Sequence, residues 1–346
     1  MPAPVRIAIV GAGTTARHHV EALRALDDRV EIVAGVDSVD GDAGHAAAFC
    51  AGHGIPYAGT DLKKALADAA PDLVHVCAGD PLEPVSAALA GGAHVLVEPP
   101  PALSLRGLDD LDAAQAPGGP YVAMVFPHRF GPGPRRLRDL VATGALGRPL
   151  LALCHTTWWR ERGGLLTGPG TYHLDLLVSV LGGWTEIQAA AHRLARPGRA
   201  EDVSLAHVTF ANGAVASIVT SVLSPREESH VRFDLERASV ELTRVRGHGD
   251  HWRVTPAPGH EKAVLAAWNA HTDGGRRGLP AQVADVVSSV RAGTPPPVSP
   301  AAARDTVRLV AGIYAAAFTG HLVAPAGLEP GSAFYERMEG FGPPWA

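Results

Sequence analysis

The first twenty-six residues constrain the fold of this chain more than any other segment. Residues 5–10 form a continuous apolar run, which is typical of a strand buried on both faces of a sheet. The run breaks at Gly11-Ala12-Gly13, and residues 15–26 follow with helical spacing of their apolar side chains. A strand, a glycine corner and a helix in this order predict the first βα unit of a parallel sheet.

The same alternation of apolar runs and helical patterns continues to residue 126. Further strands are predicted at residues 31–36, 73–77, 94–97 and 121–126, with helical patterns between them. Parallel strands need crossover connections, which are usually helices. We therefore expect a Rossmann-type parallel sheet over residues 1–126.

The pattern changes in residues 127–346. Neighbouring strands with turn signals are predicted at residues 186–192, 203–210, 214–222, 230–234 and 239–244. Asn212-Gly213 between two of these runs is a strong hairpin signal. These runs predict an open antiparallel sheet, and helices at residues 280–292 and 300–319 complete a second domain of the α+β class. The fold class that we expect is therefore α/β plus α+β.

Composition restricts the class of protein. A chain of 346 residues exceeds the usual size of one domain core, and its net charge of -5 without a basic run argues against nucleic acid as a partner. The three cysteines, Cys50, Cys77 and Cys154, show no metal-binding spacing, so we expect a reducing compartment. The chain enters a strand at once, without a signal peptide, and the apolar run 307–318 is too short to span a bilayer. We therefore expect a cytoplasmic protein without membrane contact.

The glycine corner is the main candidate for ligand binding. In Gly11-x-Gly13-x-x-Ala16, the first glycine permits the tight turn and the second lets the backbone approach a pyrophosphate. Ala16 lets the helix pack closely on the strand, and Thr14 and Thr15 lie at the helix N-terminus, where N–H groups and the helix dipole favour phosphate. The alternative is a tight turn that binds nothing.

Asp37 stands at the end of the second predicted strand. A carboxylate at this place accepts hydrogen bonds from both ribose hydroxyls and repels a 2′-phosphate, so it favours NAD. Ser38 would tolerate NADP, but no arginine is adjacent to hold the extra phosphate. The cofactor that we expect is NAD, with NADP as the alternative.

These motifs make the chain similar to the Gfo/Idh/MocA family of NAD(P)-dependent oxidoreductases over essentially its whole length. The motifs that carry the resemblance are GAGTTA at residues 11–16, HVLVEPPPALS at 94–104, HRF at 128–130, GALGRP at 144–149 and GTYHLDLL at 170–177. The resemblance implies a Rossmann domain, an open-sheet second domain and a substrate pocket between them. It also implies a homodimer or homotetramer formed through the sheet face, with a small molecule as substrate.

Three functional motifs of that family are altered here. Its Glu-Lys-Pro motif reads Glu98-Pro99-Pro100, so the lysine that touches cofactor and substrate is replaced by Pro99. Its Asp-x-x-x-His-x-x-Asp motif reads Gly168-x-x-x-Tyr172-x-x-Asp175. Its Thr-Pro-Pro motif near the nicotinamide reads Ala78-Gly79-Asp80. By this resemblance Ala78, Glu98 and Pro99 lie on the cofactor side.

Loss of those groups matters because hydride transfer to or from an alcohol carbon also requires movement of a proton, and a positioned acid–base group contributes about 10²- to 10⁴-fold. The candidates for this role are Tyr172 and His173, which point about 100° apart on an ideal helix. Asp175 shares a helix face with Tyr172 and could orient a substrate hydroxyl, or pair locally instead.

Four further residues are candidates for substrate binding. His128 and Arg129 follow a strand end, and Arg129 could hold a carboxylate or phosphate, or form a structural ion pair. Trp158 and Arg160 precede a glycine-rich loop and would suit a flat or anionic substrate, unless they pack in a core. We expect no metal site, since the segment His248-Gly249-Asp250-His251 matches no common ligand spacing.

Three functions remain open at this point. The first is an NAD(P)-dependent oxidoreductase with a non-standard acid–base set, acting on a small polar molecule such as a sugar derivative or a biosynthetic intermediate. The second is a non-redox enzyme on the same scaffold, which catalyses an elimination, an isomerisation or a cyclisation. The third is a catalytically inactive binding or regulatory subunit.

Overall fold

The computed structural model of the chain describes residues 3–37, 43–77, 80–99, 104–243, 251–271 and 274–345. The chain divides into two compact units. The first unit comprises Met1–Phe126 and Leu279–Arg304, and the second comprises Pro127–Gly278 and Asp305–Ala346.

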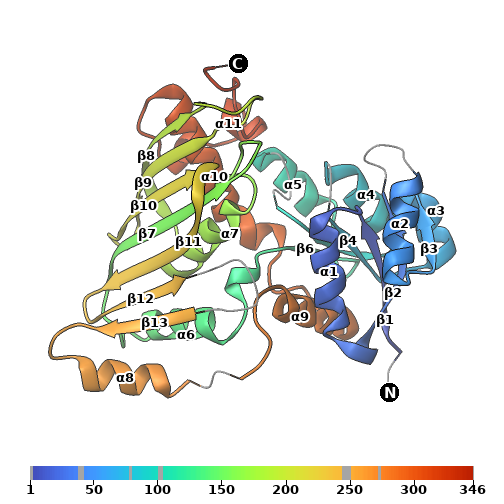
Figure 1. The fold of residues 1–346 in the computed structure, drawn as a ribbon, viewed down its shortest axis with the longest axis horizontal. Helices are drawn as coiled ribbons and strands as arrows, with labels where there is room; N and C mark the ends of the chain where they lie inside the picture. The colour runs from blue at the N-terminus through green and yellow to red at the C-terminus, as the bar shows by residue number, and fades with distance from the viewer. Residues whose placement is uncertain are drawn as a thin grey trace. The chain divides into compact units, whose positions relative to one another are not determined.

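The first unit contains a parallel sheet of six strands in the order β3-β2-β1-β4-β5-β6 (Figure 1). The strands are β1 Val5–Val10, β2 Val30–Val36, β3 Tyr57–Gly59, β4 Leu73–Val76, β5 His94–Val97 and β6 Val122–Met124. The helices around them are α1 Thr14–Arg24, α2 Ala43–His53, α3 Leu62–Ala69, α4 Leu82–Ala90, α5 Leu105–Ala113 and α9 Gly278–Ala292. This strand order has its reversal between β1 and β4, as in a Rossmann fold, and it confirms the predicted fold of the N-terminal half.

Residues 279–304 pack with the first unit, whereas we expected all of 127–346 in the second domain. The reason is a pair of buried hydrogen bonds from α9 to the end of the sheet. The side chain of Gln282 accepts from the backbone N–H of Phe126 at 3.0 Å and donates to the carbonyl of Met124 at 2.6 Å. The N–H of Met124 also donates to the carbonyl of Val298. These contacts join segments that lie far apart in the sequence, so local sequence patterns could not predict them.

The second unit contains a sheet of seven strands in the order β13-β12-β11-β7-β10-β9-β8. The strands are β7 Pro149–Trp159, β8 Trp184–His192, β9 Val203–Phe210, β10 Val215–Ser221, β11 Leu223–Leu235, β12 Ala238–Thr243 and β13 His251–Pro256. The helices are α6 Pro132–Ala142, α7 Gly170–Leu181, α8 Glu261–Asn269, α10 Pro300–Thr319 and α11 Ala333–Glu336. Short 3₁₀ turns occur at Asp27–Arg29, Pro127–Arg129 and Pro325–Gly327.

The pairing of this second sheet is mixed, because the central strands β7 and β10 run parallel while all other pairs are antiparallel. The chain leaves β7, crosses through α7 and returns along β8, β9 and β10, so β10 arrives beside β7 in the same direction. The turn signals predicted the antiparallel hairpins correctly. They contain no information on this pairing of strands far apart in the sequence.

The two faces of the second sheet differ. On one face α7 and α10 cover the sheet, and α10 lies so close that a side chain at Gly312 would collide with Ile187 and Trp184 of β8. On the opposite face, large apolar side chains remain exposed, among them Leu205 and Val215. We call this second side the open face of the sheet.

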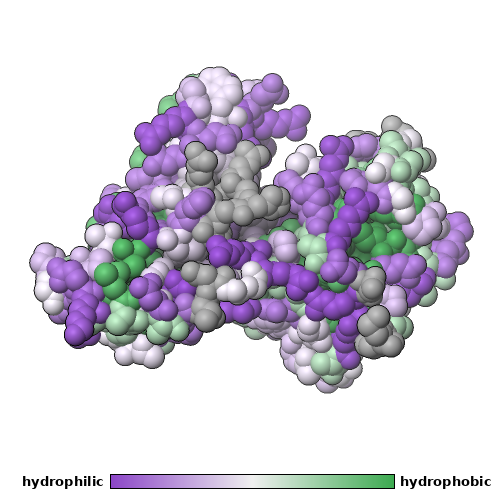
Figure 2. Space-filling model, turned by 60° about the horizontal axis from the view of Figure 1, so that its bottom comes forward, coloured by the Kyte–Doolittle hydropathy of each residue, from purple (hydrophilic) through white to green (hydrophobic). Residues whose placement is uncertain are grey.

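No helix within the described residues is both long and apolar enough to cross a membrane. On the face of the molecule shown in Figure 2, hydrophilic and hydrophobic residues are interspersed.

Candidate functional site

The glycine corner after β1 has the backbone geometry that phosphate binding requires. Gly11 has a φ of 104°, which favours glycine, and its N–H donates to the carbonyl of Val36 at 2.7 Å. Gly13 caps the N-terminus of α1, and a Cβ placed on it would meet no atom within 4 Å. Ala16 is buried against the sheet, whereas Thr14 is exposed and Thr15 half-buried. The corner therefore presents free space directly above oriented helix N–H groups.

Asp37 follows β2 at the same edge of the sheet and is buried. Its carboxylate lies 2.7 Å from Nδ1 of His45, a half-exposed side chain on α2, and its N–H donates to the carbonyl of Gly59. A ribose bound here would meet a held carboxylate with an imidazole beside it. Ser38 and Ala78, which we expected near the cofactor, lie outside the described residues.

A network of buried polar side chains, which the sequence analysis did not predict, links α1 to the ends of β4 and β5. His19 of α1 is fully buried, with Nε2 at 2.6 Å from a carboxylate oxygen of Glu98 and Nδ1 at 2.8 Å from Nδ1 of His75. Cys77, next after β4, also contacts His19. Glu98 directly follows β5, so this network begins at the carboxyl edge of the sheet, where open α/β sheets bind ligands.

The protonation states of the side chains in this network follow from their burial and their contacts with one another. Burial opposes a charge on His19, but Cys77 and Glu98 outweigh it and raise the pKa of His19. Burial and the neighbouring His19 lower the pKa of His75 well below its usual value. Burial raises the pKa of the Cys77 thiol. These pKa shifts favour a cationic His19 that donates to Glu98 and to a neutral His75.

Pro99 is partly buried at the position where the resemblance would place a lysine. A hydrogen bond from His19 of α1 brings a cationic side chain to Glu98. The buried imidazolium of His19 therefore lies next to the Glu98 carboxylate, where the family's lysine is replaced by the uncharged Pro99.

In the second unit, Asp175 and Arg129 form a buried ion pair. Arg129 donates from Nε and from Nη2 to the two carboxylate oxygens of Asp175, both at 2.6 Å, and Thr306 donates to one of them at 2.9 Å. Asp175 is fully buried. Of the two alternatives that the sequence left for each residue, this geometry favours local pairing over direct binding of a substrate.

His173 points into the interior of the second unit. Its Nδ1 lies 2.7 Å from the hydroxyl of Thr156 on β7, and its Nε2 lies 3.1 Å from the hydroxyl of Ser229 on β11. Burial lowers the pKa of His173 to about 4. A neutral ring with both nitrogens engaged is a positioned structural group, and it does not have the free proton that a catalytic acid needs.

Tyr172 differs from its neighbour, because it is only partly buried on the first turn of α7. The His128 ring meets it edge-on, with centroids 5.7 Å apart, and stacks on His173 on its other side. Burial, with a smaller contribution from His173, lowers the pKa of His128 well below its usual value. Tyr172 and His128 are thus the partly exposed members of the three rings, and the neutral His128 lies beside the Tyr172 phenol.

Trp158 and Arg160 differ in their exposure to solvent. Trp158 is 5% exposed in an apolar cluster with Leu165 and Val222, whereas Arg160 is exposed and lies with its guanidinium 4.9 Å from the Trp158 ring centroid. Trp158 therefore has a core position. Arg160 lies at the surface, in contact with the indole.

The sequence signals that could have found the unforeseen residues are weak. His19 lies three positions after Ala16 on the helix face that packs on the sheet, and His75 interrupts an otherwise apolar strand. A histidine at each of two buried positions was the available signal. Their meeting with Glu98 depends on how α1, β4 and β5 pack together.

Comparison with known families places both halves of the chain in one group. Residues 5–124 match the model of the oxidoreductase family with an NAD-binding Rossmann fold, and residues 135–241 match the C-terminal domain model of GFO/IDH/MocA proteins. The resemblance inferred from the motifs is confirmed, and the first unit is an NAD-binding Rossmann domain.

Three individual relatives illustrate the likeness. D-glucoside 3-dehydrogenase of Escherichia coli (strain K12) is 28% identical over 273 residues, which cover 69% of this chain and 77% of the relative. The structure of aldose-aldose oxidoreductase from Caulobacter crescentus, complexed with glycerol, has a TM-score of 0.79 at 20% identity and covers 93% of this chain and 99% of its own. That of the WlbA dehydrogenase from Bordetella pertussis, in complex with NADH and UDP-GlcNAcA, has a TM-score of 0.77 at 20% identity and covers 93% and 98%. At these identities the two structures show a shared fold.

Proposed function

We propose, from the premise that the chain belongs to the Gfo/Idh/MocA family of oxidoreductases, that it is an NAD-dependent dehydrogenase or reductase of a sugar derivative. The named relatives act on, or were crystallised with, sugars and polyhydroxylated molecules, and this supports the substrate class. The residues present fit the cofactor, which when bound supplies the hydride acceptor or donor.

The observation that carries this proposal is the corner between β1 and α1. Gly11 makes the turn with its positive φ, Gly13 leaves the helix N-terminus open, and Asp37 offers a carboxylate at the next strand end. Phosphate groups are held by the N–H groups of α1, and ribose hydroxyls by Asp37.

Tyr172 is the group that we assign to proton transfer. Oxidation of an alcohol removes a hydride from carbon and a proton from oxygen. The phenol of Tyr172 is partly exposed, as is the neighbouring His128, whereas His173 is buried with both ring nitrogens engaged. His173 and the Asp175–Arg129 pair position the first turns of α7 from the interior. They act as positioning residues.

Glu98 and His19 are assigned to the cofactor side of the reaction. Glu98 has a side chain that is 12% exposed at the carboxyl edge of the sheet, and the buried His19 holds it by a 2.6 Å hydrogen bond. The hydrogen bond from His19 fixes the orientation of the Glu98 carboxylate, which we assign to binding a hydroxyl group of ribose or substrate.

The proposed chemistry is tested with one substitution and its control. Tyr172→Phe should lower kcat about 100-fold, because a positioned acid–base group contributes about 10²- to 10⁴-fold, while NADH binding stays unchanged. Tyr121→Phe changes a partly buried tyrosine of the first unit and should leave both unchanged. The readouts are NADH fluorescence titration and turnover at 340 nm across a panel of sugars, sugar acids and amino sugars.

The outcomes separate the three functions that the sequence left open. Full turnover in Tyr172→Phe refutes the assignment of the proton donor. NADH binding without any redox turnover, together with elimination or isomerisation of a panel member, favours the non-redox enzyme. If the protein shows neither NADH binding nor turnover, the result favours a regulatory subunit.

We also propose that the chain self-associates through the open face of the second sheet. Leu205 on β9 and Val215 on β10 are 42% and 46% exposed there, beside the partly buried Val219. Removing exposed apolar side chains from water is the usual driving force of subunit association.

A further inference from the structure

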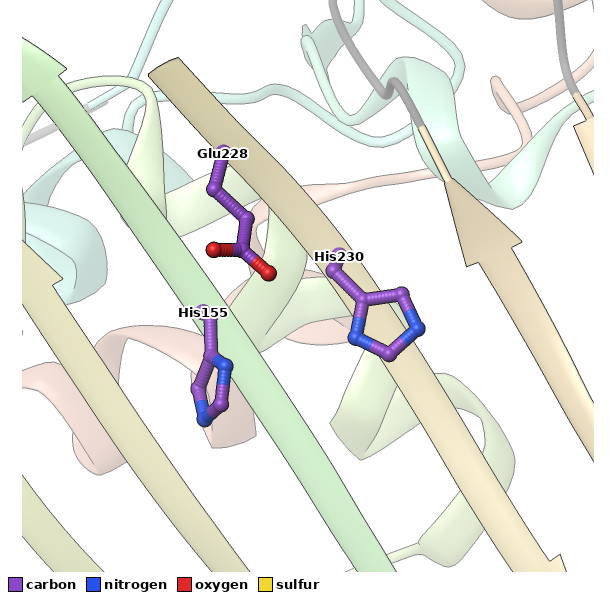
Figure 3. Close-up of side chains that lie close together, drawn as sticks. All are labelled: His155, Glu228 and His230. Carbon is purple, nitrogen blue, oxygen red and sulfur yellow. The ribbon is translucent and has the colours of Figure 1, made fainter. Parts of the chain in front are cut away.

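We propose that His155, Glu228 and His230 form a binding site for a divalent transition-metal ion on the open face of the second sheet (Figure 3). This site is separate from the dinucleotide corner, and it does not depend on the proposed redox function. It departs from our expectation that the chain has no metal site.

The register of two antiparallel strands brings the three side chains together. His155 of β7 is paired directly with His230 of β11, and Glu228 lies two residues before His230. Side chains two residues apart on a strand share a face of the sheet. The ligand atoms of all three groups lie within 4.8 Å of one another.

The ring of His230 is already oriented by a second carboxylate. Its Nε2 lies 3.0 Å from Glu241 of β12, and Arg253 of β13 pairs with the other oxygen of Glu241. With Nε2 donating to Glu241, Nδ1 is the ring nitrogen left for a metal ion, and Figure 3 shows a nitrogen of this ring on the side facing His155 and Glu228. A carboxylate behind a histidine is the usual outer partner of a metal-bound imidazole.

The other two ligands are free to bind. The imidazole of His155 forms no hydrogen bond to another described residue, and its ring centroid lies 6.5 Å from that of His230. Glu228 lies 3.7 Å from the largely exposed guanidinium of Arg226, and an exposed pair of this kind contributes little. A dication would compete easily for this carboxylate.

Two imidazoles and one carboxylate select the class of ion. This set suits Zn²⁺ and its first-row neighbours, whereas Mg²⁺ and Ca²⁺ prefer oxygen ligands alone. With bonds of about 2.0–2.2 Å, tetrahedral donors lie about 3.4 Å apart, so small side-chain rotations close the site. Three protein ligands leave at least one position of a tetrahedral site unfilled.

The test uses chelator-treated protein without a histidine tag. Co²⁺ absorption reports the ligand geometry, and calorimetry with Zn²⁺ gives stoichiometry and Kd. We expect one equivalent bound with micromolar or tighter Kd, and a rise in melting temperature on Zn²⁺ addition. Glu241→Gln should weaken binding about 10- to 100-fold through its effect on His230, and His155→Ala and His230→Ala should weaken it further.

The matched control is His207→Ala, which removes an exposed histidine of β9 on the same face. It should bind Zn²⁺ as the wild type does. The proposal is wrong if wild-type protein takes up no stoichiometric ion at micromolar metal, or if His207→Ala weakens binding as much as His155→Ala. Should a ligand variant fail to fold, Glu228→Gln and the melting shift of the wild type still decide the question.

Discussion

At the scale of single residues, Asp37 is the side chain that we propose to set the choice of cofactor. Replacing it by asparagine removes the charge to which we assign binding of the ribose hydroxyls and repulsion of a 2′-phosphate. Hydrogen bonds to charged groups contribute about 1.5–3 kcal/mol, so Asp37→Asn should weaken NADH binding about 10- to 100-fold. Binding of NADPH should change less, and fluorescence titration with both cofactors measures the ratio.

The control for this prediction is Asp68→Asn, which removes an exposed carboxylate of α3 that pairs with Lys64. Its cofactor affinities should match the wild type. Equal loss of NADH binding in both variants, or none in Asp37→Asn, would show that Asp37 does not hold the ribose.

His173 predicts a pH dependence of stability. Its pKa is lowered to about 4 in the folded state, from a usual value of 6.5, by burial. The folded state binds fewer protons, so the stability from this neutral ring is present above pH 6.5 and is lost as pH falls toward 4. Between pH 7.5 and 5, this one residue should reduce the unfolding free energy by about 2 kcal/mol.

His173→Gln should lack this component, whereas His207→Gln, an exposed histidine of the same unit, should keep it. Urea unfolding followed by tryptophan fluorescence at both pH values gives the difference. An identical pH dependence in wild type and His173→Gln would mean that the ring is already charged at neutral pH or is not buried.

At the scale of elements, a substitution at the junction of β1 and α1 should change NADH affinity without changing the stability of the fold. A methyl group on Gly13 would meet no protein atom within 4 Å, so Gly13→Ala should leave the melting temperature nearly unchanged. The same methyl group would lie where a phosphate approaches the helix N-terminus, and loss of one charge-assisted hydrogen bond is worth about 10-fold or more in affinity. Calorimetric titration with NADH and a thermal melt test both halves of this prediction.

Gly52→Ala provides the comparison, because this glycine of α2 also has open space around its Cβ position but lies away from the corner. It should bind NADH normally and gain about 0.5–1 kcal/mol from helix propensity. Unimpaired NADH binding by Gly13→Ala would place the phosphates elsewhere.

The elements themselves were predictable to very different degrees. The strand at residues 5–10 and the glycine corner follow from local periodicity, and the structure has them where they were expected. The parallel pairing of β7 with β10 was not predictable, because it depends on the path of residues 160–214 and not on the strands' own sequence. The packing of α9 on the first unit depends likewise on Gln282 reaching Met124 and Phe126.

At the scale of the whole molecule, the open face of the second sheet predicts the oligomeric state. The double variant Leu205→Asp/Val215→Asp places charges on this face, and in a two-fold interface each would be buried against apolar partners. It should shift the protein to a smaller species in analytical ultracentrifugation. The variant monomer should stay folded, since both side chains are largely exposed.

Leu322→Asp, at a side chain 50% exposed outside the strands of this sheet, should leave the assembly unchanged. A wild-type protein that sediments as a monomer at micromolar concentration contradicts the proposed association. An oligomer that the double variant does not disturb would place the interface on another surface.

By itself, the sequence determined the alternation of strands and helices, the glycine corner with Asp37, and the family of the chain, since these depend on residues that are neighbours along the chain. The tertiary structure decided which polar side chains meet. It turned His173 inward to Thr156 and Ser229, and it joined His19 to Glu98. It also brought His155 beside His230. Such meetings depend on packing between distant segments, where burial and charge are properties of the assembled fold and no local pattern records them.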